Sequence, residues 1–312
     1  MHPLQYHAGQ VAVQEEANTR HVADKLAHWV GPAAAYAESA DMVLLAACTD
    51  TESGPLRFSV LSGAAPIARP AGPGRIALAH PAERLVEDGG TVAVGGLVLS
   101  LERAERARIN GRLEREDGQA VLVADEAFTL CRKYLAPSDA PRGEPMLGPT
   151  ARDAIALDDA WVSGVVAAAH TAFLASIAPD GAPDVAHRGG PPGFIALDPA
   201  GRTASWTEFV GDGVFKSAGN IRATATASLL LLDLPTGDAL ELAGRCAYET
   251  TLTRFRPREE PLVRMRDPFP EQGRMTLAIE RGWRLRSLTH PRRELAVARV
   301  TSQDTPDEQA PR

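Results

Sequence analysis

The most regular feature of the sequence is a series of short apolar runs separated by glycine, proline and charged residues. Runs of this length, rich in valine, leucine and alanine, predict β-strands rather than long helices. We expect strands at residues 41–50, 57–63, 89–102, 107–114, 171–179, 183–189, 193–199, 202–210, 226–234 and 239–249. The chain is therefore expected to be mainly β.

Helical patterns are confined to a few segments. Residues 14–39 have apolar residues at helical spacing, and Gly31-Pro32 is expected to end or break that run. Residues 158–170 predict a second helix, with an acidic start that suits the helix dipole. Residues 125–136 predict a short third helix. The helices thus flank the expected strands, so the class is α+β with β dominant.

A segment rich in proline, glycine and charge divides the chain into two halves. We place a linker at 141–154, between an N-terminal domain at 1–140 and a C-terminal domain at 155–300. Residues 301–312 are polar and are expected to be a disordered tail.

The two halves resemble each other. Asp41 aligns with His170, a separation of 170 − 41 = 129 residues, and Gly111 aligns with Gly244, a separation of 244 − 111 = 133. Because the separations are so similar, we expect a tandem duplication of one β-rich unit. The period is too long for a solenoid repeat.

Composition narrows the function. The 312 residues are 44% hydrophobic and 23% charged, with a formal net charge of −7. An acidic chain of this kind is not expected to bind nucleic acid, and no apolar run has the length of a membrane span. The start lacks the pattern of a secretory signal, so we expect a cytoplasmic protein. Three widely spaced cysteines and unclustered histidines predict neither a disulfide framework nor a metal site.

One short segment suggests a ligand site. His187 and Arg188 directly precede Gly189-Gly190, and two prolines follow. A cationic side chain beside open backbone N–H groups suits an anion such as a phosphate. A tight hairpin with a solvated arginine explains the same residues, so both interpretations stay open.

A second segment, 209–233, leads from a glycine-containing loop into a strand. Lys216, Ser217 and Asn220 could supply a charge, a hydroxyl and an amide to a phosphate ester. A polar helix capped by Ser217 and Asn220 is the alternative.

Taken together, these segments resemble the pyridoxamine 5′-phosphate oxidase-like family of FMN-binding split barrels. The resemblance is carried by "FLASIAPDGAPDVAHRGGPPGF", by "GDGVFKSAGNI" with the following "ASLLLLD", and by "LELAGRC". The first half looks like a weaker copy. The resemblance implies two tandem split β-barrels with flanking helices and a non-covalently bound FMN, held mainly by the C-terminal barrel.

The family resemblance also implies roles for individual residues. Its phosphate contacts match Arg188, Lys216 and Ser217, and Asn220 would fix the loop. Flavin-edge positions match His187, Gly189 and Gly190.

Trp206 lies on a strand near the expected site, where its ring could stack on the flavin or simply fill the core. His187 is the candidate for proton transfer, because imidazole titrates near neutral pH.

The first half departs from the pattern at residues 61–68, where "LSGAAPIA" replaces "HRGGPPGF". Either this unit has lost its ligand, or it completes a cofactor site at the junction of the two units. We expect an FMN-dependent oxidoreductase acting on a small organic molecule. A nicotinamide electron donor and a homodimer are both compatible with this expectation, and the sequence does not decide either. The alternatives are a non-catalytic flavin- or haem-binding module and a deazaflavin-dependent reductase.

Overall fold

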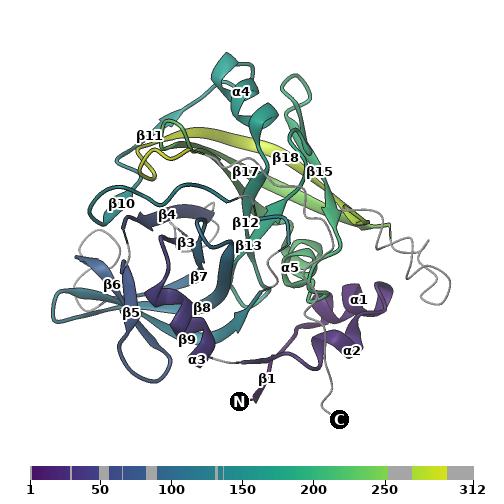
Figure 1. The fold of residues 1–312 in the computed structure, drawn as a ribbon. Coiled ribbons are helices and arrows are strands. Elements are labelled where there is room, and N and C mark those ends of the chain that lie inside the picture. Colours follow the sequence, from purple (N-terminus) through teal and green to yellow (C-terminus); the bar gives the residue numbers. More distant parts are fainter. Residues whose placement is uncertain are drawn as a thin grey trace, which may run out of the picture.

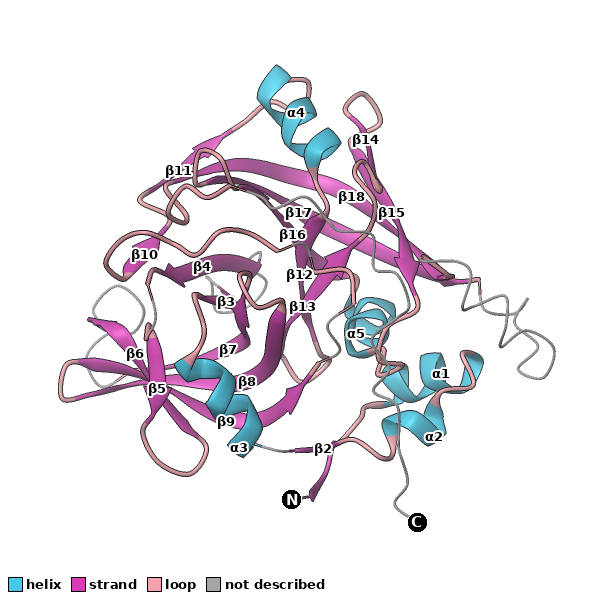
Figure 2. Cartoon of the chain, viewed as in Figure 1, coloured by secondary structure: helices cyan, strands magenta, loops and turns pink. Residues whose placement is uncertain are grey.

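The computed structural model describes residues 2–28, 30–48, 56–64, 66–81, 90–130, 133–135, 137–251 and 269–293. About half of these residues form two curved antiparallel sheets of eight strands each, and five helices lie around them in the described part of the chain (Figures 1 and 2). The expected mainly β fold with flanking helices is confirmed. The predicted disordered tail, 301–312, lies outside the described residues.

The first sheet has the order β10-β4-β3-β7-β8-β9-β6-β5. Its strands are β3 (Met42–Cys48), β4 (Leu56–Ser62), β5 (Ala68–Pro70), β6 (Arg75–Pro81), β7 (Thr91–Ser100), β8 (Glu105–Glu116), β9 (Gln119–Thr129) and β10 (Met146–Gly148). A separate two-stranded ladder joins β1 (His2–Pro3) to β2 (Ala27–His28).

The second sheet has the order β13-β12-β16-β17-β18-β15-β14, and β11 pairs with β18. Its strands are β11 (Ala151–Ala154), β12 (Thr171–Ile177), β13 (Pro183–Gly189), β14 (Ile195–Asp198), β15 (Thr203–Phe209), β16 (Thr226–Asp233), β17 (Asp238–Thr250) and β18 (Glu271–Arg286). The helices are α1 (Ala8–Glu16), α2 (Arg20–Ala23), α3 (Val30–Glu38), α4 (Ala160–Ala168) and α5 (Lys216–Thr224).

The two sheets repeat one topology. The order β4-β3-β7-β8-β9-β6-β5 becomes β13-β12-β16-β17-β18-β15-β14 when each strand is replaced by its counterpart. Both long central strands also bulge at the aligned glycines: the ladder register shifts at Gly111 in β8 and at Gly244 in β17. A Cβ at either glycine would stand 2.0 Å from a carbonyl oxygen of the neighbouring strand, so each bulge requires glycine.

The core explains why some strands are apolar on both faces. Successive side chains of β3 alternate between two clusters. Val43 and Leu45 pack inside the first unit, whereas Met42 and Leu44 pack against residues of the second unit such as Phe173. Since one face of β3 is buried inside the first unit and the other at the junction with the second unit, its sequence reads as a continuous apolar run.

Three local predictions need correction. Residues 125–129 belong to β9 rather than to a short helix, because they complete the ladder with β8. Gly31-Pro32 lies in the first turn of α3 and does not end a helix, since proline is tolerated where the N–H has no intrahelical acceptor. Residues 14–39 form parts of α1, α2 and α3 instead of one helix.

The segment between the two units is not structureless. Residues 146–148 form β10 on the edge of the first sheet, and 151–154 form β11 against the second. The domain limits that we drew at 140 and 154 stay a prediction. At the other end of the chain, α1 lies against α5, and α2 packs against α1 (Figure 1).

Candidate functional site

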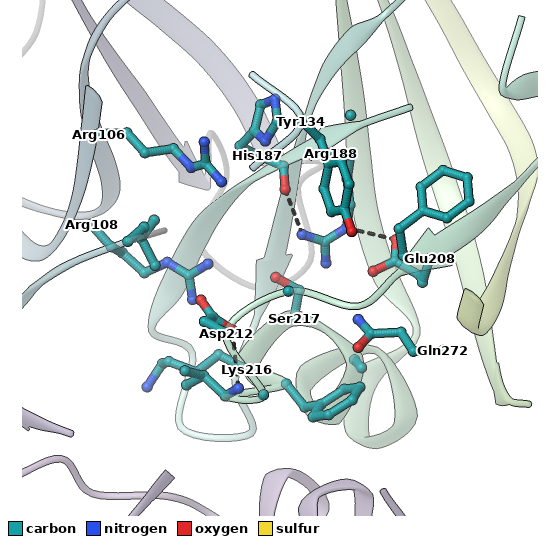
Figure 3. Close-up of a pocket in the computed structure, with 18 of the residues that line it drawn as sticks. Arg106, Arg108, Tyr134, His187, Arg188, Glu208, Asp212, Lys216, Ser217 and Gln272 are labelled. Atoms are coloured by element: carbon teal, nitrogen blue, oxygen red, sulfur yellow. Dashed lines mark hydrogen bonds and ion pairs between the residues drawn. The ribbon is translucent and has the colours of Figure 1, made fainter. Parts of the chain in front are cut away.

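A cavity of about 90 Å³ lies where the two units meet. The first unit contributes Arg106 and Arg108 from β8 and Tyr134 from the segment after β9. The second unit contributes the end of β13, the end of β15, residues 211–215 and the first turn of α5 (Figure 3). The walls are therefore built from both halves of the chain.

Five of the eight residues predicted from the sequence line this cavity: His187, Arg188, Gly189, Lys216 and Ser217. The structure thus brings together two segments that are separate in the sequence. The three remaining residues do not line the cavity: they are Gly190, Trp206 and Asn220.

Gly189 and Gly190 are required by the protein's own packing. A Cβ at Gly189 would stand 2.1 Å from the carbonyl oxygen of Tyr134, and one at Gly190 would stand 2.7 Å from Cβ of Phe194. Both distances are shorter than any ordinary contact between carbon or oxygen atoms. The glycine pair therefore allows Tyr134 and Phe194 to close over the end of β13.

Arg188 is held by the second unit. Its Nη1 donates to the carbonyl oxygen of His187 at 2.9 Å, and its Nε lies 2.7 Å from Oε1 of Glu208. The same carboxylate oxygen accepts a 2.7 Å hydrogen bond from Nε1 of Trp206. The Trp206 ring is only 2% exposed and belongs to the core of the second unit, where it orients Glu208 from behind.

Lys216 and Ser217 join a buried polar network across the junction. Nζ of Lys216 lies 2.7 Å from Oε2 of Glu126, and the Ser217 hydroxyl donates to Oδ2 of Asp184 at 3.1 Å. Arg108 Nη1 lies 3.3 Å from the other oxygen of Asp184. Each of these contacts except the Ser217–Asp184 bond joins a residue of one unit to a residue of the other.

Asp184 is the centre of this network. Burial alone would raise the pKa of its carboxyl group, but the charges of Arg108 and Lys216 and the hydrogen bonds from Asn110 and Ser217 outweigh it and lower the pKa. Asp184 is therefore ionised at neutral pH.

The first turn of α5 provides backbone donors. Phe215, the residue before the helix, has a left-handed conformation (φ 53°, ψ 28°), and its carbonyl accepts the N–H of Gly219 at 2.9 Å. The N–H groups of residues 216–218 precede this first intrahelical bond, so they have no acceptor within the helix. Residues 216–218 all line the cavity, and the helix dipole favours an anion at this end of α5.

His187 is neutral. Burial, followed by the charges of Arg106 and Arg188, holds the pKa of its imidazole well below the usual value. Its Nε2 is buried and makes no hydrogen bond with the part of the chain that the structure describes. Nε of Arg108 is in the same situation. His187 Nε2 and Arg108 Nε are thus buried polar atoms at the junction of the two units.

The formal charges of the site nearly cancel. The lining holds four cations, on Arg106, Arg108, Arg188 and Lys216, and two carboxylates, on Glu208 and Asp212. Asp184 and Glu126 add two carboxylates directly behind the lining. Attraction for an anion therefore depends on where the donors point rather than on net charge.

Sequence reasoning missed four important lining residues: Arg106, Arg108, Tyr134 and Glu208. The two arginines had a usable signal, because side chains two apart on a strand share a face. No signal in the sequence identifies Tyr134, which reaches the cavity because its backbone turns through a left-handed conformation with φ of 63°.

A second cavity, of about 330 Å³, lies under α4. Its lining is mostly apolar, with Trp161 and Val165 from α4 and Leu101 from the first unit. Asp233 is its carboxylate, and this group already accepts hydrogen bonds from Trp161 and Thr236. The smaller cavity at the junction has the clustered charges and helix amides, so we take that one as the candidate site.

Within the described ranges, no group of three or more His, Cys, Asp or Glu side chains is arranged to hold a metal ion. None of the helices that the structure describes combines the length and apolar character required to cross a bilayer.

Comparison with known proteins gives structural neighbours only. No family model matches the chain, and no curated protein matches it. Among solved structures, HupZ from Group A Streptococcus is 16% identical, covers 38% of this chain and 86% of its own, and has a TM-score of 0.28. A pyridoxamine 5′-phosphate oxidase-related, FMN-binding protein from Nostoc punctiforme is 13% identical, with coverages of 42% and 85% and a TM-score of 0.29.

A third neighbour is described as an F420 reductase. It is 19% identical, covers 38% of this chain and 94% of its own, and has a TM-score of 0.26. The structural neighbours thus include proteins of the split-barrel family that the sequence resembles.

Proposed function

We propose that the chain binds a flavin, with FMN as the expected form, in the cavity between its two units, and that it is an oxidoreductase for a small organic molecule. One observation carries the proposal: four cationic side chains and the first turn of a helix line one cavity, and the buried Nε2 of His187 has no hydrogen bond within the described chain. This set of donors suits a phosphate ester attached to a polar heterocycle.

The residues present fit such a group. The amides of the first turn of α5, with Ser217 and Lys216, would hold the phosphate, and Arg108 faces the same part of the cavity. Toward the other end, Tyr134 and Phe209 supply aromatic walls, with ring centroids 5.8 Å apart. The enclosed volume is smaller than the roughly 300–1,000 Å³ of an ordinary ligand pocket, so the mouth of the cavity would hold part of the cofactor.

A bound flavin would supply hydride or electron transfer, and the protein would supply binding, orientation and local charge. Glu208 is held in place by Arg188 and Trp206, so its carboxylate can accept a hydrogen bond from a ligand N–H group. His187 stays the proposed proton-transfer residue. As a neutral imidazole with a buried Nε2, it would accept a proton or a hydrogen bond at that atom.

The first test is an absorption spectrum of the purified protein, taken after incubation with FMN and desalting. We expect a retained flavin spectrum. It should be lost in the double variant Arg188→Ala, Lys216→Ala and kept in the control Arg245→Ala, Arg281→Ala, which removes two exposed arginines from β17 and β18. Retention in the first variant would contradict the assigned site.

The same spectrum separates the other interpretations. A sharp haem band would favour a haem-binding module, and retention of deazaflavin but not FMN would favour a deazaflavin-dependent reductase. A protein that retains none of these would refute the proposed function. A nicotinamide donor is tested by adding NADH or NADPH to the loaded protein and following flavin bleaching.

A further inference from the structure

Residues 2–28 contact the second unit beside the candidate site. The backbone of α1 touches that of α5, because a Cβ at Gly219 would stand 2.4 Å from Cα of Gln10, and a Cβ at Gly9 would stand 2.8 Å from the carbonyl oxygen of Gly219. Contact this close requires glycine on both helices. It fixes α1 directly against the helix whose first turn lines the cavity.

Polar side chains fix the relative position of the two helices. Oδ1 of Asn220 accepts from Nε2 of Gln10 at 2.9 Å and lies 2.8 Å from Nε2 of His7. Its Nδ2 donates to the Ser176 hydroxyl on β12 at 3.1 Å. Asn220 is 1% exposed, so it is a buried tie between α1, α5 and the sheet. This explains why Asn220 lies outside the cavity lining.

The same N-terminal segment binds the loop at the cavity. Nε2 of Gln14 donates to the carbonyl oxygen of Val214 at 2.7 Å, and the Thr19 hydroxyl donates to the carbonyl oxygen of Gly213 at 2.9 Å. Gln14 is fully buried, and its Oε1 accepts from Arg20 at 3.0 Å. Two successive carbonyls of the loop are therefore turned toward α1 and α2.

The direction of these carbonyls decides the direction of the neighbouring N–H groups. In a trans peptide the C=O of one residue and the N–H of the next point in opposite directions. With the carbonyls of Gly213 and Val214 turned toward the N-terminal segment, the N–H groups of Val214 and Phe215 point to the other side of the loop, which lines the cavity. Asp212 accepts the first of them at 3.0 Å.

We propose that residues 2–28 are a positioning element of the ligand site: through Gln14 and Thr19 they set the direction of the loop at 213–215, and thereby the affinity for the phosphate of a bound ligand. This rests on the proposed flavin function. Gln14 and Thr19 touch no cavity surface and act only through the loop. Their loss should weaken the phosphate contacts and leave the contacts to the flavin ring unchanged.

The test compares Gln14→Leu and Thr19→Val with the matched control Gln119→Leu, which removes a similar glutamine bond to a carbonyl, that of Leu78, on the far side of the first sheet. The dissociation constants of FMN and riboflavin are measured by flavin fluorescence, and the melting temperature of each flavin-free protein is recorded. Riboflavin lacks the phosphate, so it reports the ring contacts alone.

We expect FMN binding to weaken about tenfold in Gln14→Leu and about threefold in Thr19→Val, as for loss of one oriented hydrogen bond. Riboflavin affinity should change less than twofold, and the control should match the unchanged protein. FMN affinity equal to that of the control, or equal losses for FMN and riboflavin, would overturn the proposal. If Gln14→Leu does not fold, the partly exposed Thr19→Val decides the question. Failure of the unchanged protein to bind FMN would instead refute the proposed function.

Discussion

Gly95 offers the most direct test of the junction between the two units. It lies on β7 of the first sheet, where β13 of the second sheet crosses it. A Cβ at Gly95 would stand 2.7 Å from both Cα and N of Asp184 and 2.8 Å from its carbonyl carbon. Gly95→Ala therefore places a methyl group against the backbone of the residue at the centre of the junction network.

The magnitude follows from these distances. Carbon atoms in contact are about 3.5–4.0 Å apart, so the methyl group is roughly 0.7 Å or more too close to the backbone atoms of Asp184. The backbones of β7 and β13 are each held by hydrogen bonds within their own sheet, so they cannot move away as the end of a side chain can. Overpacking of this kind costs about 1–3 kcal/mol. A shift of Asp184 would also disturb Arg108 and Ser217, so ligand binding should weaken together with stability.

Urea unfolding followed by circular dichroism measures the effect. With a slope of about 3 kcal/mol/M, a loss of about 2 kcal/mol lowers the midpoint by roughly 0.7 M. The matched control is Gly164→Ala in α4, where an added Cβ would meet nothing within 4 Å. Alanine is the better helix residue, so the control should gain about 0.5–1 kcal/mol. A Gly95→Ala protein as stable as the unchanged chain would refute the close crossing of the two units.

The remaining predictions concern titration, catalysis and stoichiometry. The pKa of Asp184 in the folded protein lies below its unfolded value of about 3.9. Its contribution to stability is therefore complete above about pH 4 and is lost as the pH falls through the folded value. Asp184→Asn should remove this loss of stability at acid pH, as seen in urea midpoints measured between about pH 2.5 and 6. His187 stays neutral in the fold and gains a proton near pH 6.5 when unfolded, so stability should fall as the pH drops from 7 to 5, and His187→Gln should reduce that slope. The same His187→Gln protein should keep bound flavin and lose turnover, and unchanged turnover would remove His187 from the mechanism. Titration of the desalted protein should find one flavin per chain, and two per chain would contradict the single cavity assigned to the junction.

The sequence predicted ten of the sixteen strands described in the two sheets, because their apolar runs and glycine breaks follow from burial within and between the sheets. It missed β5, β6, β9, β10, β11 and the long β18, whose exposed and buried positions alternate and interrupt the apolar run. Its alignment of Gly111 with Gly244 matches two equivalent bulges in the structure, where only glycine tolerates a carbonyl at 2.0 Å. The N-terminal helices were harder. Their placement against α5 depends on contacts such as Gln10 with Asn220, which are 210 residues apart. Helical spacing carries no information about such a partner.

The sequence predicted only part of the candidate site, because the site combines local segments with residues that are distant in the chain. Arg188, Lys216 and Ser217 share a recognisable local pattern, so two short segments were enough to find them. Arg106 and Arg108 come from the other unit, in a stretch that reads as an ordinary exposed strand. Glu208 rather than Trp206 lines the cavity. Both side chains lie on the same buried face of β15, but Glu208 stands near the end of the strand, where its carboxylate meets Arg188 and accepts the indole N–H of Trp206.

Two units with one topology create two equivalent junction positions, and the structure shows why one of them holds the cavity. In the first unit the N–H of Gly63 donates to the carbonyl oxygen of Asp41, and in the second unit the N–H of Gly190 donates to that of His170. When the two units are aligned on these bonds, Leu61 takes the place of Arg188. This differs by one residue from the alignment suggested by the sequence. The separation of 133 residues between Gly111 and Gly244 also relates Arg108 in β8 to Glu241 in β17, so Glu241 occupies the position equivalent to that of Arg108.

Leu61 and Glu241 are both fully buried, and β10 pairs with the strand that carries Leu61, whereas β13 is the last strand in the order of its sheet. At this equivalent position, leucine and glutamate thus stand in place of two arginines, β10 covers the strand, and Glu241 is paired with Arg152 and accepts from Ser228. The equivalent position in the other half keeps its cations facing a cavity. This asymmetry is the physical reason to expect one ligand site in a chain built from two similar halves.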